Sequence, residues 1–165
     1  MQSTIRNMQE TDASSVMEIF NHYVENDFAS WFEQPLPVQA FGRFQEMTRN
    51  YPAIDTCDEN QDVTGFVFLH AYHPAPAFQR TAEITYFIHH QHVRKGLGKL
   101  MLDKLVAEAI PIGADNILAS ISSRNAGSLA FHEKYGFREC GRFPAIGKKF
   151  GQDFDVVSMQ LAIKQ

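Results

Sequence analysis

The sequence predicts a mixed α/β sandwich, in which helices cover both faces of one mixed, mostly antiparallel central sheet. Segments with the alternating pattern of strands and segments with the helical period follow one another in the order β-α-α-β-β-β-α-β-α-β-β. The hydrophobic content of 44% is that of a folded protein, and 165 residues suit a single domain, 1–165, that buries roughly 70% of its unfolded surface. No repeat or linker divides the chain, so these segments are expected to share one fold.

The N-terminal part is predicted to form a short strand and two helices. Residues 3–8 can form the strand, and Thr11 or Asp12 can cap the first helix. The apolar stripe of that helix consists of Val16, Ile19, Phe20 and Tyr23. The second helix is expected from about Val38 to Asn50. Between the helices lies the aromatic segment Phe28–Phe32, which can either fill the core or line a ligand pocket.

A hairpin and a further strand are predicted next. Pro52–Cys57 and Val63–His70 have the composition of antiparallel strands on either side of the polar turn Asp58–Asp62. The proline-containing segment 74–76 then interrupts the chain before the strand Thr81–Ile88. In that strand, one face carries Thr81, Glu83, Thr85 and Phe87, and the other carries Ala82, Ile84, Tyr86 and Ile88.

A glycine-containing turn, Arg94–Lys99, and an amphipathic helix that continues to Ala109 follow the strand. The apolar stripe of this helix consists of Gly98, Met101, Leu102, Leu105, Val106 and Ala109. The start of a helix presents unpaired N–H groups and the positive end of the helix dipole, and the basic side chains of the turn add charge. An anion such as a diphosphate is therefore the expected ligand.

The spacing of the glycines distinguishes three kinds of phosphate-binding turn. A P-loop requires Gly where Val93 stands and Ser or Thr where Leu100 stands, and a dinucleotide fingerprint requires a third Gly where Met101 stands. Gly96 and Gly98 resemble the pyrophosphate loop of the GNAT acetyltransferases, Gln/Arg-x-x-Gly-x-Gly/Ala, with Val93 in place of the usual Gln or Arg. A tight turn with solvated lysines is the alternative that this motif alone leaves open.

The C-terminal part is predicted to contain three strands and a helix. Asn116–Ile121 is the first strand, and Asn125 can cap the short helix Ala126–Tyr135, which Gly136 can terminate. The remaining elements are two strands and their glycine- and lysine-rich connection, at residues 137–143, 154–163 and 147–151.

Residues Asn125–Phe137 resemble the second signature of the GNAT superfamily: an Asn, a short helix that carries Ala, an aromatic pair with Glu-Lys, and Gly-Phe. Two signatures in the expected order identify the chain as a member of that superfamily, with the GNAT fold. Most of the chain also resembles the phosphinothricin and methionine sulfoximine N-acetyltransferases. The marks of this resemblance are Asn21-His22-Tyr23, Tyr51-Pro52, Thr81-x-Glu83, His92-x-Arg94-x-Gly96-Leu97-Gly98, His132-Glu133 (where most GNAT proteins have Tyr at the first position), and Gly147-Lys148-Lys149-Phe150-Gly151 followed by Asp155-Val156-Val157.

The resemblance implies acetyl-CoA as the donor, a small amino-acid-like amine as the acceptor, and a homodimer. Direct transfer through a tetrahedral intermediate is expected, with backbone N–H groups stabilising the oxyanion. The residues expected to bind acetyl-CoA are Tyr86, Phe87 and Ile88 through the strand backbone, Arg94, Lys95, Gly96, Leu97, Gly98 and Lys99 around the diphosphate, and Asn125 and Lys134.

Glu83 and His132 are the candidate catalytic residues. Acetyl transfer requires a neutral amine, which costs about 1.4 kcal/mol at pH 7 for an α-amine, and Glu83 can take the proton directly or through one water. The alternative for Glu83 is an ion pair with Arg80. His132 shares a helix face with Asn125 and can protonate the leaving thiolate or relay the amine proton. The alternative for His132 is a structural histidine half-buried against the sheet.

This chain differs from the acetyltransferases that it resembles at residues expected to line the acceptor site. Ala75 stands where Arg is common, Asp153 where Trp is frequent, and Gln34 near an expected acidic or polar position. The loss of a cation and of an aromatic side chain is expected to change which acceptor fits. The residues expected to bind the acceptor are Phe28, Trp31, Ala75, Pro76, Ala77, Glu83 and Asp153.

Composition argues against several other classes of protein. A net charge of −4 gives no case for nucleic-acid binding, and no apolar run approaches a membrane span. The N-terminal residues lack the apolar core of a signal peptide, so a cytoplasmic protein is expected. Cys57 and Cys140 form neither a disulfide framework nor a hydrolase motif, and His89, His90 and His92 lack a nearby carboxylate or cysteine, so no metal is expected.

The expected function is therefore acetyl-CoA-dependent N-acetylation of the α-amine of a small amino acid or analogue, as in detoxification of such analogues or in metabolism. One alternative is a peptide or protein N-terminal acetyltransferase, which would need an open groove that the bulky segment Phe28–Phe32 disfavours. Another is a CoA-binding sensor without turnover, against which the presence of both Glu83 and His132 argues.

Overall fold

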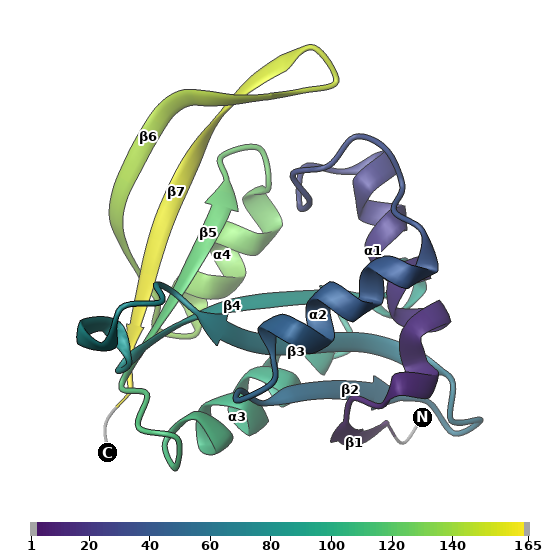
Figure 1. Ribbon diagram of the computed structural model, residues 1–165. Coiled ribbons are helices and arrows are strands. Elements are labelled where there is room, and N and C mark those ends of the chain that lie inside the picture. Colours follow the sequence, from purple (N-terminus) through teal and green to yellow (C-terminus); the bar gives the residue numbers. More distant parts are fainter. Residues whose placement is uncertain (1–2, 164–165) are drawn as a thin grey trace.

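The computed structural model describes residues 3–163 and contains a seven-stranded sheet in the order β1-β2-β3-β4-β5-β7-β6 (Figure 1). The strands are β1 Thr4–Asn7, β2 Ala53–Cys57, β3 Val63–Ala71, β4 Thr81–Ile88, β5 Asn116–Ser122, β6 Arg138–Lys149 and β7 Gln152–Ala162. The α-helices are α1 Ala13–Asn26, α2 Phe41–Met47, α3 Leu97–Ala109 and α4 Ala126–Lys134. Neighbouring strands are antiparallel except for β4 and β5. The predicted fold class and the predicted order of elements are confirmed.

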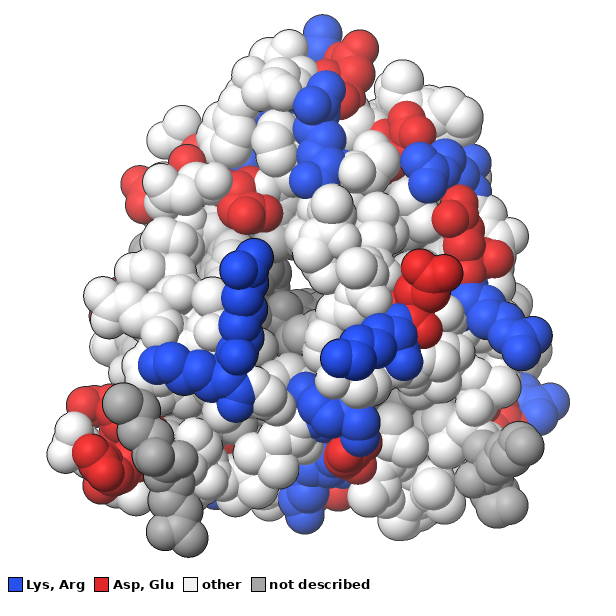
Figure 2. All heavy atoms as spheres, turned by 180° about the vertical axis from the view of Figure 1, so that it is seen from behind, with Lys and Arg blue, Asp and Glu red and all other residues white. Residues whose placement is uncertain are grey.

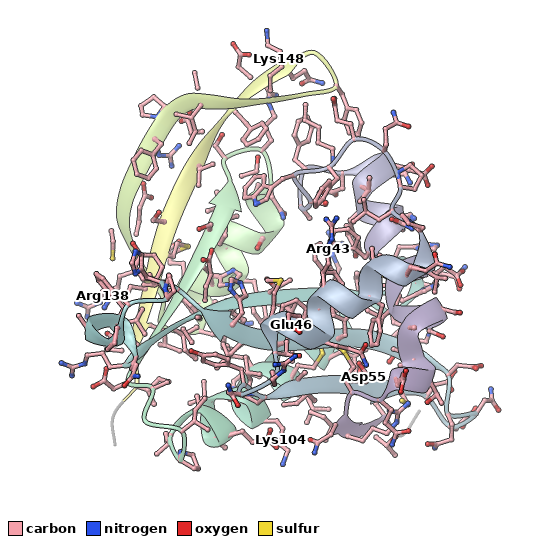
Figure 3. The ribbon with its side chains drawn as sticks, viewed as in Figure 1. Arg43, Glu46, Asp55, Lys104, Arg138 and Lys148 are labelled. Atoms are coloured by element: carbon pink, nitrogen blue, oxygen red, sulfur yellow. The ribbon has the colours of Figure 1, made fainter. Side chains whose placement is uncertain are left out.

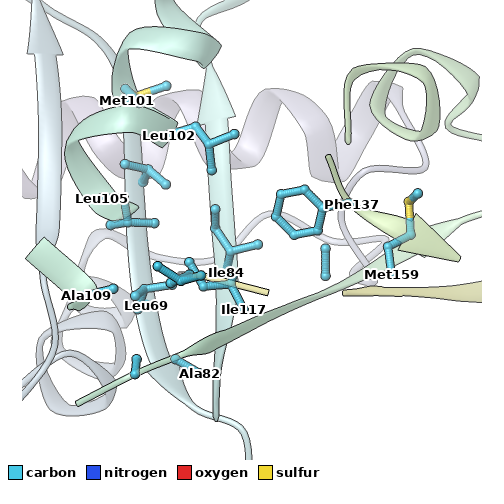
Figure 4. Packing of buried hydrophobic residues seen from close by; sticks show 14 of the residues in the cluster. Leu69, Ala82, Ile84, Met101, Leu102, Leu105, Ala109, Ile117, Phe137 and Met159 are labelled. Atoms are coloured by element: carbon cyan, nitrogen blue, oxygen red, sulfur yellow. The ribbon is translucent and has the colours of Figure 1, made fainter. Parts of the chain in front are cut away.

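Helices cover both faces of the sheet because its strands are apolar on both sides (Figure 1). Phe66 and Phe68 of β3 pack with the buried side chains of α1 and α2, whereas Val67 and Leu69 pack on the opposite face with those of α3. Figure 4 shows this second core, in which Leu105 is fully buried. Each such side chain stabilises the fold by roughly 1.5–3 kcal/mol relative to an exposed one.

β4 and β5 are parallel neighbours only near their beginnings. The paired residues are Thr81–Glu83 of β4 and Asn116–Leu118 of β5, and in the described chain no pairing between the two strands continues beyond them. β4 remains paired with β3 and β5 with β7, so each strand loses its partner only on the side where the two face each other. The two strands separate visibly in Figure 1. Backbone groups on this edge of β4 are therefore available to a ligand.

Two predicted boundaries need correction. The connection expected at 147–151 is mostly strand, because β6 continues to Lys149 and only Phe150-Gly151 form the turn. Gly147 makes this possible, since a Cβ at this position would lie 2.1 Å from the Phe154 ring. The second helix is shorter than predicted: a 3₁₀ turn, Val38–Ala40, precedes α2, which ends at Met47.

Asp12 does not cap α1 with its side chain, contrary to one of the two predicted caps. Its carboxylate instead accepts hydrogen bonds from the Gln9 backbone N–H (2.7 Å) and from the Arg6 guanidinium (2.8 Å). Burial alone would raise the pKa of Asp12, but these hydrogen bonds lower it to about 2. The interaction joins the end of β1 to the turn that precedes α1.

Asp55 of β2 lies beside this group and has no exposed surface. Neither of its carboxyl oxygens has a hydrogen-bond partner among the described residues, and the Arg6 Nη1 atom is 3.5 Å from its Oδ2 atom. Burial, together with the negative charge of Asp12, raises the pKa of Asp55 to about 8. Asp55 is therefore mostly protonated at pH 7.

No helix within residues 3–163 combines the length and the apolarity that crossing a bilayer would require.

Candidate active site

Two adjoining cavities lie where β4 and β5 separate. The aromatic cavity, of about 450 Å³, is bordered by α1, α2, the loop between them, and β4. The turn cavity, of about 540 Å³, is bordered by the glycine turn before α3 and by α4. The residues that line both cavities are Ala29, Tyr86, Phe87, Asn125 and Ser128. Because they share these walls, the two cavities form one continuous cleft.

The turn cavity receives the N-terminus of α3. Gly96 adopts a left-handed conformation (φ 82°), and its carbonyl accepts the first helical hydrogen bond, from the Leu100 N–H. The N–H groups of residues 97–99 therefore have no partner within the helix and border the cavity together with Arg94. On the side opposite to that of Figure 1, Lys and Arg side chains border a hollow in the surface (Figure 2). These donors and charges suit a diphosphate.

The two glycines of the turn have different roles. A Cβ on Gly96 would meet nothing within 4 Å, so this position needs glycine for its backbone conformation. A Cβ on Gly98 would lie 2.9 Å from the Phe131 ring, so this position needs glycine for the contact between α3 and α4. The packing of α3 against α4 is therefore a reason for glycine at position 98, in addition to any close approach of a ligand to the backbone.

The separated edge of β4 runs along the cleft. Tyr86, Phe87 and Ile88, which are predicted to bind the cofactor, all line the turn cavity. The Ile88 carbonyl oxygen already accepts a hydrogen bond from the Tyr23 hydroxyl (2.5 Å), which attaches α1 to the end of β4. Burial raises the pKa of Tyr86, so its hydroxyl stays neutral.

Glu83 lies at the last paired position before β4 and β5 separate, opposite His70 of β3 and Leu118 of β5. Its half-buried side chain lines the aromatic cavity. The suggested ion pair with Arg80 is absent, because the Arg80 guanidinium binds Asp115 instead. Glu83 has no ion-pair partner among residues 3–163, so its carboxylate is available to a ligand in the cavity.

His132 of α4 is buried rather than half-buried, with 2% of its surface exposed. Its Nδ1 atom lies 2.7 Å from the Ser128 carbonyl oxygen and therefore carries the proton that it donates there. Its Nε2 atom has no hydrogen-bond partner among the described residues, although the side chain lines the aromatic cavity. Burial lowers the pKa of His132, so the ring is neutral and Nε2 carries an unshared lone pair.

Asn125 caps α4 as predicted, since its side-chain oxygen accepts a hydrogen bond from the Ser128 N–H (3.2 Å). Gly136 then ends the helix in the left-handed conformation (φ 96°). Lys134 also lines the turn cavity, and its ammonium lies 5.4 Å from the Tyr135 ring centre. Lys95 is not among the residues that line the turn cavity.

The loop between α1 and α2, residues 27–37, forms one wall of the aromatic cavity and contributes Trp31 to it. Asn21 holds the end of this loop through two hydrogen bonds of 2.8 Å with the backbone of Leu36. The buried Lys149 ammonium donates to the carbonyl oxygens of Tyr23, Asp27 and Ser30. Trp31 is 49% exposed and stacks on Phe154 of β7.

Several residues predicted to bind the acceptor lie away from the cleft of this chain. Phe28 lines neither cavity and packs on Phe150 and Phe154. Asp153 is exposed on β7, 3.4 Å from the Lys148 ammonium at the hairpin tip (Figure 3). The predicted residues of the loop between β3 and β4 lie in and before a 3₁₀ turn that does not line either cavity: Ala75, Pro76 and Ala77.

The aromatic cavity also contains polar residues that the sequence did not single out, notably His70 and Arg43. His70 could have been found from the register of β3 and β4, because it lies directly opposite Glu83. Arg43 is on α2, one helical turn before Met47, which also lines the cavity.

The histidines of the segment 89–92 gather at the end of α1. The His90 ring stacks on His22 (centres 4.2 Å apart) and on His89 (4.5 Å). Residues 3–163 contain no group of three or more His, Cys, Asp or Glu side chains arranged to hold a metal ion.

Comparisons with known proteins agree with this geometry. The model of the family described as "Acetyltransferase (GNAT) family" matches residues 16–137. The L-amino acid N-acyltransferase MnaT of Escherichia coli is 32% identical over 98% of this chain and 95% of its own length. The L-methionine sulfoximine/L-methionine sulfone acetyltransferase of Salmonella typhimurium is 31% identical over the same shares of the two chains.

A solved structure shares the whole fold. The GNAT superfamily phosphinothricin acetyltransferase from Sinorhizobium meliloti, in complex with AcCoA, is 29% identical to this chain and superposes with a TM-score of 0.93. The match covers 99% of this chain and 89% of that one.

Proposed function

Since this chain belongs to the acetyltransferase (GNAT) family, we propose that it transfers an acetyl group from acetyl-CoA to the α-amine of a small amino acid or amino-acid analogue. The chain is an N-acetyltransferase; the proposal concerns its donor, its acceptor and the residues that act on them. The names of the two relatives support an amino-acid acceptor, and the continuous cleft offers room for a donor and an acceptor side by side.

The residues of the turn cavity fit acetyl-CoA. The unpartnered N–H groups at the start of α3, together with Arg94 and Lys99, would hold its diphosphate, and the separated edge of β4 at Tyr86 would hold its extended arm. When bound, acetyl-CoA supplies a thioester that a neutral amine can attack. Asn125 and Lys134 border the same space.

Glu83 would accept the proton of the acceptor amine. Its carboxylate has no ion-pair partner in the described chain and lies where the cleft passes between the separating strands, and this observation carries the proposal. A positioned base of this kind accelerates proton transfer by about 10²- to 10⁴-fold. One water molecule can bridge Glu83 and the amine where the distance requires it.

His132 would relay a proton rather than supply one. Its Nδ1–H is engaged with the Ser128 carbonyl, and its lowered pKa keeps Nε2 unprotonated at pH 7. A neutral imidazole in a cavity wall, with one unshared lone pair, can accept a proton directly or through water. The role of an acid toward the departing thiolate is therefore the less favoured of its two predicted roles.

The experiment is a thiol-release assay with the purified protein, acetyl-CoA and a panel of amines. The panel contains methionine sulfoximine, phosphinothricin, methionine, aromatic amino acids and a short peptide. Release with at least one free amino acid is expected. Release with the peptide alone, or none despite acetyl-CoA binding, contradicts the proposed acceptor.

Two variants test the base. Glu83→Gln is expected to lower kcat by about 10²-fold or more while acetyl-CoA binding is retained. Glu108→Gln, on the part of α3 that lies away from the cleft, is the matched control. A kcat for Glu83→Gln within a few-fold of wild type contradicts the role of Glu83.

We also propose that the protein is a cytoplasmic homodimer. β6 lies at the edge of the sheet and exposes Phe143 and Ile146, and a second copy would cover these side chains. The exposed thiol of Cys140 suits a reducing compartment. Sedimentation of the wild type as a dimer and of Ile146→Asp as a monomer is expected; a monomeric wild type contradicts the dimer.

A further inference from the structure

Among the described residues that line the aromatic cavity, Arg43 is the only lysine or arginine. It belongs to α2, whose cavity side also presents Phe44 and Met47. These residues follow the helical spacing that places side chains on one face. Figure 3 shows Arg43 extending from α2 toward the space between α2 and the separating strands.

The guanidinium of Arg43 is not committed to another residue. Among residues 3–163 no carboxylate lies within ion-pair distance of it, whereas Arg49, just beyond the end of α2, is paired with Glu46 at 2.6 Å. An arginine at the rim of a cavity that makes no ion pair within the protein can direct its planar guanidinium toward a ligand.

The cavity therefore carries one cationic and one anionic side chain on different elements, Arg43 on α2 and Glu83 on β4. The rest of its lining is mainly apolar and includes Phe20, Phe32, Phe68 and Phe87. A free α-amino acid has the complementary pattern: an amine, a carboxylate on the same carbon, and a side chain. With its amine at Glu83, such an acceptor leaves its carboxylate to be paired.

We propose that Arg43 binds the α-carboxylate of the acceptor and thereby selects free amino acids over amides, esters and the N-terminal residues of peptides. The inference rests on the proposed function, because it assigns a residue to the acceptor named there. Arginine suits this task because it can donate two parallel hydrogen bonds to one carboxylate. Arg43 is a binding residue in this proposal, so its loss acts on KM more than on kcat.

The experiment pairs two acceptors with four proteins. The acceptors are the best amino acid of the panel and its α-amide, which differ only at the carboxylate. The proteins are the wild type, Arg43→Met, Arg43→Lys and the control Arg49→Met. Circular dichroism and acetyl-CoA binding establish that each variant is folded; Arg43 is an exposed side chain, and its replacement removes no core contact.

Arg43→Met is expected to raise KM for the amino acid about 10- to 100-fold, with kcat within about threefold, and to change kcat/KM for the amide by less than about threefold. Arg43→Lys keeps the positive charge but lacks the planar guanidinium, so a KM between those of the wild type and Arg43→Met is expected. Arg49→Met is expected to resemble the wild type with both acceptors.

Equal effects of Arg43→Met on the acid and on the amide, or no effect on either, overturn the inference while the proposed function stands. A wild type that uses the amide as well as the acid also overturns it. A wild type that acetylates no free amino acid but does acetylate a peptide is a different result: it contradicts the proposed function, and the inference fails with it.

Discussion

Replacement of Asp55 by Asn is expected to remove a pH dependence from the stability of the fold. Burial and the neighbouring Asp12 raise the pKa of Asp55 to about 8 in the folded state, whereas an ordinary value of 3.8 applies when the chain is unfolded. Between these values the folded protein holds a proton that the unfolded chain has released. The stabilisation is complete below the unfolded pKa and is lost as the pH rises through the folded pKa.

The size of this effect follows from the two pKa values. One pKa unit corresponds to 1.36 kcal/mol, so between pH 5 and pH 8 the Asp55 contribution to the free energy of unfolding falls by about 3.5 kcal/mol. Asp12 does not obscure this window. Its pKa of about 2 adds stability that is present above its unfolded value of 3.8 and is lost only as the pH falls toward 2.

Urea unfolding at several pH values between 5 and 8 measures the effect, with the fluorescence of Trp31, the single tryptophan, as the signal. Asn has nearly the shape of the neutral acid but does not ionise. The difference in stability between Asp55→Asn and wild type is therefore expected to shift by about 3.5 kcal/mol in favour of the variant from pH 5 to pH 8.

A matched control separates this effect from a general effect of charge. Glu59→Gln removes a carboxylate from the exposed turn between β2 and β3, and its stability relative to wild type is expected to stay constant over the same range. If Asp55→Asn differs from wild type by the same amount at pH 5 and pH 8, Asp55 is not the buried neutral acid that its surroundings indicate.

Three further substitutions test other parts of the structure. Gly98→Val places atoms against the Phe131 ring, so a loss of about 1–3 kcal/mol in stability and weaker acetyl-CoA binding by calorimetry are expected, whereas Gly42→Ala, where a Cβ meets nothing, is expected to bind normally. Leu105→Ala leaves a cavity beneath α3 and is expected to cost about 2–5 kcal/mol in urea unfolding; a smaller loss would mean that the core collapses around it. Lys149→Met leaves three carbonyl oxygens without their shared donor, so a stability loss of about 1–3 kcal/mol and a higher KM for the acceptor are expected, and an unchanged KM would contradict a role of this lysine in shaping the cavity.

The order of elements could be predicted because each one carries a local signal. Asn125 and Gly136 bracket α4, as side-chain capping and left-handed glycine require, and the alternation in Thr81–Ile88 matches the two faces of β4. These features depend on residues only a few positions apart. Local physics is therefore sufficient to place them.

The course of β6 could not be read in the same way. Pro144 and Gly147 have the composition of a loop and fall outside the predicted strand at 137–143, yet they lie within β6. An edge strand tolerates proline because one side needs no partner, and two register irregularities accommodate the extra residues. Only the partner strand, with the Phe154 ring over Gly147, determines this outcome.

Some residues that line the aromatic cavity could be singled out from the sequence, and others could not. Glu83 and His132 stand out as residue types in a recognisable context, whereas Arg43 is one of many surface arginines until α2 is placed above the cleft. The separation of β4 from β5 is likewise a property of the sheet. No residue in either strand signals where their pairing stops.

The bonds that hold the loop between α1 and α2 bear on how the enzyme could acquire a new acceptor. Asn21 and Lys149 fix both ends of this wall through hydrogen bonds within the protein itself, so an arriving amine need not order the loop, and little conformational entropy is lost on binding. A rigid wall of this kind selects acceptors according to the shape of the acceptor molecule. Changes of acceptor in evolution would therefore come more readily from single side chains that face the cavity than from movement of the backbone around it.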